Sequence, residues 1–306
     1  MPLHIETPLI ESRPLGLASG RTVLLKLDAL QPPGSFKIRG IGAACEVHAS
    51  RGARRFVSSS GGNAGIAVAH AGRRLAIPVT VVVPESTTAR ARQLIAQEGA
   101  DLVVHGASWQ EANAHALAMV GETDAFLHPF DDPLLWPGHA TMIDEAARQG
   151  PRPDAVVLSV GGGGLLCGVV EGLRRNQWAD VPIVAVETEG AASLQTSMRA
   201  GRRVTLAAIT SIATSLGAKQ VCEQAFRHAN ERPIVTTAVT DAAAVKACLR
   251  FVDDHRLVVE PACGAALALA YDRAEVLAAY DCVLVIVCGG ATATVAQLEA
   301  WATSLA

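Results

Sequence analysis

The chain has 306 residues, of which 50% are hydrophobic and 4% aromatic, and its formal net charge at pH 7 is −3. This length and apolar content are enough for one large domain or two ordinary ones. The chain has neither the basic excess that a phosphodiester backbone attracts nor the aromatic residues on which bases stack, so we expect no nucleic-acid partner.

Short apolar runs rich in β-branched residues recur along the chain, as is typical of buried strands. In chain order they are 22–27, 55–59, 79–84, 102–105, 155–160, 182–187 and 282–288. Longer Ala-rich segments with helical spacing lie between them, at 63–76, 87–100, 108–123 and 241–255. Strands that alternate with helices indicate α/β layers around parallel sheets.

Two segments have the same order of elements: RRFVSSSGGNAG at 54–65 and VVLSVGGGGLLCG at 156–168. Each begins as an apolar strand, continues as a Gly-rich turn and ends as the start of a helix. Two such units suggest two sheets. We therefore predict an α/β fold with two open, mostly parallel sheets, flanked by helices, and a cleft between two domains.

The cysteines and the N-terminus indicate the compartment. Seven cysteines occur singly, without a CxxC pair, which suits a reducing compartment better than a disulfide framework. The first residues, MPLHIETPLIESRP, have no basic flank followed by an apolar stretch, so they do not resemble a signal peptide. Uncharged runs elsewhere are shorter than the roughly 18 residues of a membrane helix. We expect a cytoplasmic protein without a membrane partner.

The segment GSFKIRG, at 34–40, places Lys37 between Phe36 and Ile38. Most lysines are solvated surface charges, but a lysine held against apolar neighbours loses its proton more easily. The neutral amine can then act as a base or form a Schiff base. Lys37 is a candidate catalytic residue if the chain also supplies the other parts of such a site.

The segment SSSGGNAG, at 58–65, lies between a strand and a helix and mixes hydroxyl and amide side chains with glycines. Backbone N–H groups and hydroxyls of such a loop can bind a carboxylate, and the amide of Asn63 can bond an oxygen. The simpler interpretation is a helix N-cap, which Ser and Asn favour at any helix start. Taken alone, the segment favours the cap.

Four consecutive glycines, Gly161 to Gly164, follow the strand at 155–160 and precede the helical segment LLCGVVEGL. Glycines leave backbone N–H groups unobstructed, and a helix N-terminus adds partial positive charge, so a phosphate is the natural ligand. The alternative is a tight strand-to-helix turn without a ligand.

A nicotinamide-dependent enzyme competes for this glycine turn, because Glu187 closes the next strand where a ribose-binding acid is expected. The spacing of the glycines argues against it, since the third glycine position falls on Leu166 or Cys167. Neither GKS nor GKT follows, which excludes a nucleoside-triphosphate loop of the Walker type.

A lysine in a constrained turn, a loop for a carboxylate and a glycine loop for a phosphate together match the needs of pyridoxal phosphate. Its aldehyde binds a lysine, its phosphate needs an anion-binding loop, and its amino-acid substrate carries a carboxylate. The lysine that the substrate amine displaces can then remove the proton from the substrate α-carbon.

These residues resemble the fold-type II, or tryptophan-synthase-β-like, pyridoxal-phosphate enzymes, and within them the animal-type L-serine dehydratases, also called serine ammonia-lyases. The similarity runs almost the full length of the chain, through TPLIESRPL, PPGSFKIRG, SSSGGNAGIAVAHAGRRLAIP, PFDDPLLWPGHATMIDE, SVGGGGLLCGVVEGL, VETEGAASL, VVEPACGAALA and VCGGATAT. Biosynthetic threonine dehydratases and serine racemases have a His where this chain has Ala64, which favours the dehydratase branch.

The resemblance implies a role for each matched position. Lys37 would bind the cofactor covalently and later act as the base, and Phe36 would pack against the cofactor ring. Asn63 would bond the phenolic oxygen. The substrate carboxylate would bind the loop Ser60, Gly61, Gly62, Asn63 and Ala64, and the phosphate would bind Gly161, Gly162, Gly163 and Gly164.

Cys288 would face the pyridine nitrogen of the cofactor. An aspartate there would keep that nitrogen protonated, whereas a neutral thiol should leave it mostly unprotonated. The ring would then be a weaker electron sink, which favours prompt loss of the β-hydroxyl. Gly61 is a departure, because the most active animal dehydratases carry a small side chain at this position, and an added glycine could loosen the loop.

The resemblance also implies a monovalent cation such as potassium, with Glu187 and the carbonyls of Ala191, Leu216 and Ala218 as ligands. It implies a homodimer. The large, cofactor-binding domain would comprise 1–33 and 135–306, and the small, mobile domain with the substrate loop would comprise 34–134.

The leading hypothesis is a lyase that converts L-serine to pyruvate and ammonia, and also L-threonine to 2-oxobutyrate. A serine racemase uses nearly the same residues, because Ser60, opposite Lys37, could deliver the second proton. A non-catalytic protein that binds pyridoxal phosphate or an amino acid is a further alternative, although binding alone does not need the amine of Lys37. The nicotinamide-dependent oxidoreductase is the weakest.

Overall fold

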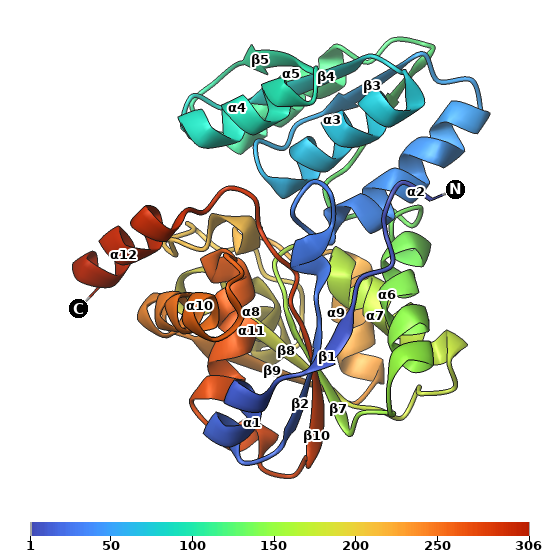
Figure 1. Ribbon diagram of the computed structural model, residues 1–306. Coiled ribbons are helices and arrows are strands. Elements are labelled where there is room, and N and C mark those ends of the chain that lie inside the picture. The colour runs from blue at the N-terminus through green and yellow to red at the C-terminus, as the bar shows by residue number, and fades with distance from the viewer. Residues whose placement is uncertain (1, 306) are drawn as a thin grey trace.

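In residues 2–305, which the computed structural model describes, ten strands form two separate sheets (Figure 1). The larger sheet has the order β1-β2-β10-β7-β8-β9. Its strands are β1 (Leu9–Glu11), β2 (Thr22–Lys26), β7 (Ala155–Ser159), β8 (Ile183–Thr188), β9 (Ile234–Val239) and β10 (Cys282–Ile286). Every neighbouring pair is parallel except β1 with β2.

The smaller sheet is parallel throughout and has the order β5-β4-β3-β6. Its strands are β3 (Arg55–Ser58), β4 (Val79–Val83), β5 (Asp101–Val104) and β6 (Asp124–Phe126). The prediction of two open, mostly parallel sheets is confirmed. All four of these strands come from within 34–134, and the domain boundaries assigned to that segment stay a prediction.

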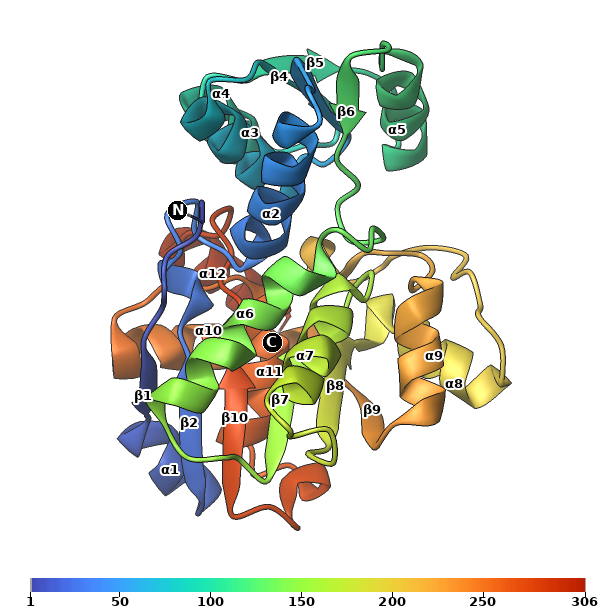
Figure 2. The same cartoon turned by 90° about the vertical axis from the view of Figure 1, so that its right-hand side faces the viewer.

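Helices cover both faces of the larger sheet (Figures 1 and 2). On one face lies α11 (Pro261–Tyr271), in contact with α1 (Arg13–Ser19) and α10 (Asp241–His255). On the other face α6 (Trp136–Gln149) packs on α7 (Gly164–Arg175). Every residue of α11 is buried, because this helix is small and apolar on all sides and lies between the sheet and other helices.

The remaining helices of the larger unit are α8 (Ser193–Ala200), α9 (Glu223–Glu231) and α12 (Val295–Ser304), with the short 3₁₀ turns η1 (Asp28–Leu30), η2 (Glu189–Ala191), η3 (Thr214–Leu216) and η4 (Glu275–Leu277). None of the helices in residues 2–305 combines the length and the apolar character that a membrane span requires.

The smaller sheet is also covered on both faces. One face carries α2 (Lys37–Ser50), α3 (Asn63–Leu75) and α4 (Ala89–Gln97), and the other carries α5 (Trp109–Ala118) (Figure 2). The predicted helix at 108–123 ends earlier, at Ala118, because Gly121 and Asp124 form a tight turn before β6.

The chain passes between the two units twice, once before α2 and once between β6 and α6 (Figure 2). Helix α2 packs on α3 of the smaller unit and on α6 of the larger one. Gly40 of α2 allows this contact, since a Cβ atom there would lie 2.5 Å from Cε1 of His139 on α6. His139 therefore fills the junction between the units, as expected of a structural residue.

Candidate active site

Lys37 is the first residue of α2, and the turn before it is bonded to the end of β10. Gly34 adopts a positive φ of 80°, and its carbonyl accepts a hydrogen bond from the N–H of Gly290 at 2.9 Å. The N–H of Phe36 donates to the carbonyl of Cys288 at 3.1 Å. These backbone bonds hold Lys37 and Cys288, far apart in sequence, in one site.

Within residues 2–305, the amine of Lys37 has one polar contact, a hydrogen bond from Nζ to the carbonyl of Pro129 at 2.7 Å. Nζ also lies 5.1 Å from the centroid of the Phe36 ring. Burial lowers the pKa of Lys37 to about 8, although the charge of Glu260 opposes this shift. The partial positive charge at the N-terminus of α2 disfavours an ammonium in the same direction. A sizeable fraction of this amine is therefore neutral near physiological pH.

The glycine turn after β7 is closely packed. A Cβ atom on Gly162 would lie 2.2 Å from the ring of Phe130, and one on Gly163 would lie 2.5 Å from Cβ of Ala225. Gly163 also has a φ of 97°, a conformation that other residues rarely adopt. The N–H groups of Gly161, Gly162 and Gly163 have no acceptor within residues 2–305, and they lie just before α7. This arrangement is suited to an anion.

The loop after β3 makes an equally tight turn into α3. A Cβ atom on Gly65 would lie 1.8 Å from the carbonyl oxygen of Ser60, so the chain can turn here only with a glycine. The N–H of Gly62 donates to Oγ of Ser60 at 3.4 Å. Ala64 is buried at the start of α3.

The space beside Gly61 is already occupied. A Cβ atom on Gly61 would lie 2.7 Å from Oγ1 and 2.8 Å from Cγ2 of Thr87. Thr87 thus fills the volume that a side chain at position 61 would need, and it packs against the loop that Gly61 was expected to loosen.

Asn63 connects the two units. Its Nδ2 donates to Oε1 of Glu260 at 2.6 Å, and its Oδ1 accepts from the N–H of Ala291 at 3.0 Å. Asn63 begins α3 of the smaller unit, whereas Glu260 precedes α11 and Ala291 follows β10 in the larger one. The loop after β3 and the turn before Lys37 therefore meet beside the segment that follows β10, past the carboxyl ends of strands from both sheets, where α/β proteins commonly bind ligands.

The family model described as "Pyridoxal-phosphate dependent enzyme" matches residues 1–289. The chain belongs to this family. The predicted family and cofactor class are confirmed, and the nicotinamide alternative is wrong.

Three proteins illustrate the similarity. The mouse protein named "L-serine dehydratase/L-threonine deaminase" is 46% identical, over 97% of this chain and 94% of its own. The crystal structure of a fungal L-serine ammonia-lyase from Rhizomucor miehei superposes with a TM-score of 0.93 at 36% identity, covering 99% of both chains. The structure of maize serine racemase has a TM-score of 0.86 at 25% identity, covering 99% of this chain and 93% of its own.

The residues of this pyridoxal-phosphate dependent enzyme fit the cofactor. The N–H groups of Gly161 to Gly163 match a phosphate, and the amine of Lys37 matches an aldehyde. Phe130 connects the two, because it packs on Gly162 and directly follows Pro129, whose carbonyl contacts Lys37.

Cys288 follows β10 and is buried. The neighbouring thiol of Cys263, together with burial, raises the pKa of Cys288 well above its usual value. The enzyme therefore presents a neutral thiol at this position. Cys263 is also buried, and it is next to the candidate site through Cys288.

One of the expected cation ligands, Leu216, lies beside the glycine turn. The carboxylate of Glu187, at the end of β8, accepts the N–H groups of Leu194 at 2.8 Å and Gln195 at 2.7 Å. Burial raises the pKa of Glu187 to about 7. The carbonyl of Leu216 accepts from the N–H of Ala218 at 2.7 Å, and a Cβ atom on Gly161 would lie 2.8 Å from Cα of Leu216. Ala191 is buried at the end of η2.

Sequence reasoning missed two contacts of the site. The carbonyl of Pro129 has no sequence signal, since every residue has a carbonyl. Glu260 had a sequence signal, because it is a single carboxylate in the apolar segment VVEPACG. An unpaired acid in such surroundings is a candidate for a function.

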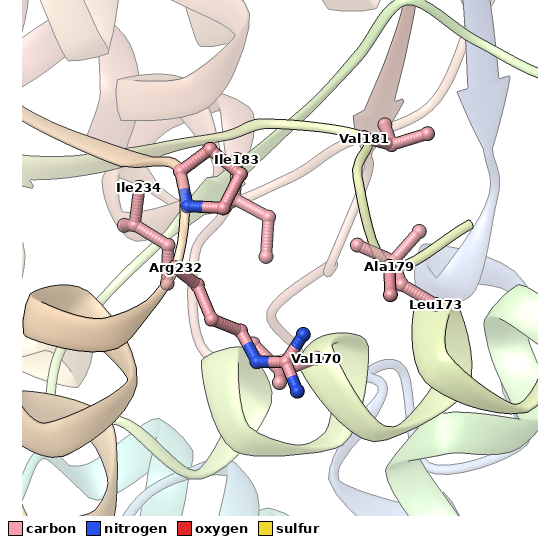
Figure 3. Close-up of a pocket in the computed structure, with 8 residues that line it drawn as sticks. Val170, Leu173, Ala179, Val181, Ile183, Arg232 and Ile234 are labelled. Carbon is pink, nitrogen blue, oxygen red and sulfur yellow. The ribbon is translucent and has the colours of Figure 1, made fainter. Parts of the chain in front are cut away.

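A small apolar crevice lies elsewhere, between α7 and the strands β8 and β9 (Figure 3). It is lined by Val170, Leu173, Ala179, Val181, Ile183, Arg232, Pro233 and Ile234, and its volume of about 10 Å³ is enough for about one water molecule. None of the candidate site residues lines it, so it is not the cofactor site.

Proposed function

We propose that this enzyme eliminates water from L-serine and releases pyruvate and ammonia, and that it converts L-threonine to 2-oxobutyrate. The names of its relatives support this substrate class. The observation that carries the proposal is the amine of Lys37, whose pKa is lowered to about 8 and whose hydrogen bond goes to a carbonyl rather than a carboxylate. Such an amine can bind an aldehyde and can later accept a proton.

Separate groups of residues would bind the cofactor and the substrate. The N–H groups of Gly161 to Gly164 and the N-terminus of α7 would hold the phosphate, Phe36 would lie against the ring, and Asn63 would donate to the phenolic oxygen. The loop from Ser60 to Ala64 would bind the substrate carboxylate.

Pyridoxal phosphate, when bound, supplies the electron sink for the pair released when the α-proton leaves. Nζ of Lys37 would take that proton. The β-hydroxyl would leave with a proton as water, and hydrolysis of the remaining C–N bond would give the keto acid and ammonia. The neutral thiol of Cys288 would leave the pyridine nitrogen unprotonated, which favours elimination.

Serine racemisation is the second candidate, because Ser60 belongs to the loop opposite Lys37 and carries a hydroxyl that can hold a proton. Two observations support elimination instead. The identity is higher to the dehydratase than to the racemase, 46% against 25%. The resemblance described for the sequence also places a histidine in racemases at the position of Ala64.

Release of keto acid from L-serine by the cofactor-loaded enzyme tests the proposal. We expect pyruvate from the wild type and a loss of roughly 100-fold to 10,000-fold or more in Lys37→Ala, the range for removal of a catalytic acid or base. Lys246→Ala is the matched control, since Lys246 is exposed on α10. D-serine without keto acid would favour the racemase, and neither product from an intact holoenzyme would overturn both.

We also propose that a monovalent cation such as potassium binds Glu187 and the carbonyls of Ala191, Leu216 and Ala218. The support is that Glu187 is fully buried and forms no ion pair with any cationic side chain in residues 2–305. Replacing potassium by tetramethylammonium at equal ionic strength should lower the melting temperature. A site saturated at ten times its Kd stabilises the fold by about 1.4 kcal/mol. Glu187→Gln should be less sensitive, and equal melting temperatures of the wild type in both salts would contradict the site.

The same proposal includes a cytoplasmic homodimer with a mobile small domain at 34–134. The seven cysteines of the described chain are all free thiols, which suits a reducing compartment. Light scattering of the holoenzyme decides the assembly, and a mass of one 31.8 kDa chain would refute the dimer.

A further inference from the structure

Glu260 lies between the two units, and the proposed function assigns it no role. It is 5% exposed and precedes the first residue of α11. Its Oε1 accepts from Nδ2 of Asn63 at 2.6 Å, and its Oε2 accepts from Oγ1 of Thr292 at 2.9 Å. Both oxygens of this carboxylate are thus bonded to residues that surround the candidate cofactor site.

The backbone leaves room for this carboxylate. A Cβ atom on Gly290 would lie 2.2 Å from Cδ of Glu260, and Gly290 has a φ of 133°. Gly290 is also the residue whose N–H bonds the turn before Lys37. Any side chain at Gly290 would displace the carboxylate from Asn63, so the turn that positions Lys37 also admits Glu260.

The position is unfavourable for an acid. Glu260 forms no ion pair within residues 2–305, and burial raises its pKa, against the hydrogen bonds of Thr292 and Asn63 and the charge of Lys37. A buried carboxylate without an ion partner destabilises the fold unless its hydrogen bonds compensate. Such a residue is a candidate for a functional role.

The contacts of Asn63 fix the orientation of its amide. The backbone N–H of Ala291 can only donate, so the atom that it meets must be Oδ1. The carboxylate of Glu260 accepts, so the atom that it meets must be Nδ2. Nδ2 carries two hydrogens, and only one is used by Glu260. The other faces Oγ of Ser215 at 3.4 Å, a long contact that a better acceptor would replace.

We propose that Glu260 is a positioning residue of the cofactor site: it holds the amide of Asn63 so that the second N–H of Nδ2 meets the phenolic oxygen of pyridoxal phosphate. Because Asn63 belongs to the smaller unit and Glu260 to the larger one, the same bond joins the two units when the cofactor binds. This proposal rests on the cofactor contact of Asn63 in the proposed function, and it is independent of the amino-acid substrate.

The test compares cofactor binding in wild-type enzyme, Glu260→Ala, Asn63→Ala and the double variant. Apoenzyme is titrated with pyridoxal phosphate, and the absorption band of the bound cofactor is followed against pH. We expect Glu260→Ala and Asn63→Ala each to weaken binding by roughly tenfold to a hundredfold, as for a hydrogen bond to a charged group. Both should shift the pH midpoint of the band in the same direction. The double variant should match Asn63→Ala alone, because Glu260 acts through Asn63.

Glu260→Gln is the conservative variant. Its amide oxygen can accept from Asn63, and its amide N–H can donate to Thr292. The affinity for pyridoxal phosphate should therefore stay within about threefold of the wild type. Thr292→Val is the matched control, since it removes the other partner of Glu260 and leaves Asn63 bonded. If Glu260→Ala does not fold, Glu260→Leu fills the same volume without an acceptor and replaces it in the comparison.

Unchanged binding and an unchanged band in Glu260→Ala would overturn the proposal, as would additive losses in the double variant. These readouts do not depend on catalysis. An enzyme that makes no keto acid but loses cofactor in Glu260→Ala would refute the proposed function and support the positioning role. Normal keto-acid release by the wild type, together with unaltered cofactor binding in Glu260→Ala, would support the proposed function and refute the positioning role.

Discussion

Lys26 on β2 and Lys37 on α2 lie in surroundings that differ sharply. Lys26, at the end of β2, is fully buried, and its Nζ lies 2.6 Å from Oε2 of Glu145 and donates to the carbonyl of Thr7 at 2.6 Å. Lys37, at the start of α2, has the carbonyl of Pro129 as its only hydrogen-bond partner in residues 2–305. Burial lowers the pKa of both, but only Lys26 has a carboxylate in contact that opposes the shift.

Lys26 belongs to a cluster of four charged side chains with Asp28, Arg39 and Glu145. Arg39 forms paired hydrogen bonds to Asp28, at 2.7 and 2.9 Å, and to Glu145, at 2.6 and 2.7 Å. Burial alone would raise the pKa of Glu145, yet Arg39 and Lys26 together hold it below its usual value. Two positive and two negative charges thus balance inside the protein.

The cluster and the candidate site share the first turn of α2. Arg39 lies two residues after Lys37 and fixes the helix to the larger unit through Asp28 and Glu145. Burial therefore does not by itself make an amine reactive. Lys26 is buried, and its charge is paired with the carboxylate of Glu145. Lys37 is held in place by the backbone hydrogen bonds of the preceding turn, and no carboxylate contacts its amine.

The largest expected difference is in stability. Lys26→Met should lower the free energy of unfolding of the apoenzyme by about 3 kcal/mol, because Glu145 stays buried with only one of its two cations. Lys37→Met should change it by about 1 kcal/mol or less, since Lys37 loses only one hydrogen bond. Urea unfolding followed by circular dichroism measures both values.

Keto-acid release should show the opposite order, with Lys26→Met active and Lys37→Met inactive. Double replacement of Lys26 and Glu145 by Met and Gln is the control, because it removes the unpaired charge and should recover part of the lost stability. Equal losses of stability in the two single variants would mean that the ion pair with Glu145 does not distinguish Lys26 from Lys37.

The sequence predicted the interior of the fold better than its edges. The strands with continuous apolar runs, such as β4 with VTVVV and β10 with CVLVI, were predicted within two residues of their observed bounds. The strands that were missed, β1, β6 and β9, all lie at the edge of a sheet. β6 has three residues, and β9 reads IVTTAV, half-exposed with two threonines, so neither has a long apolar run.

The sequence also indicates some parts of the candidate site and not others. Lys37, Asn63 and the glycines at 161–164 could be proposed from the sequence, because the chemistry proposed for them requires those side chains or the lack of one. The partner that makes Lys37 distinctive is a backbone carbonyl, and the partner that orients Asn63 is almost 200 residues away in the chain, at Glu260. Both depend on how the two units meet, which no local pattern encodes.

A smaller difference between the two lysines is expected in the pH dependence of cofactor capture. Covalent capture of pyridoxal phosphate needs a neutral amine, and the pKa of Lys37 is lowered to about 8. The capture rate of the apoenzyme should therefore rise about tenfold per pH unit below pH 8 and level off above it. An ordinary lysine would keep gaining until about pH 10.4.

Stopped-flow absorbance measures that rate, with a simple alkylamine as the reference that corrects for the titration of the cofactor itself. Lys26→Met should show the same midpoint as the wild type, because Lys26 is bonded to Glu145 and takes no part in capture. A rate that keeps rising to pH 10 would mean that the amine of Lys37 keeps its ordinary pKa. The absence of a carboxylate partner would then be insufficient to explain its chemistry, and the reactive state of Lys37 would have to come from the bound cofactor.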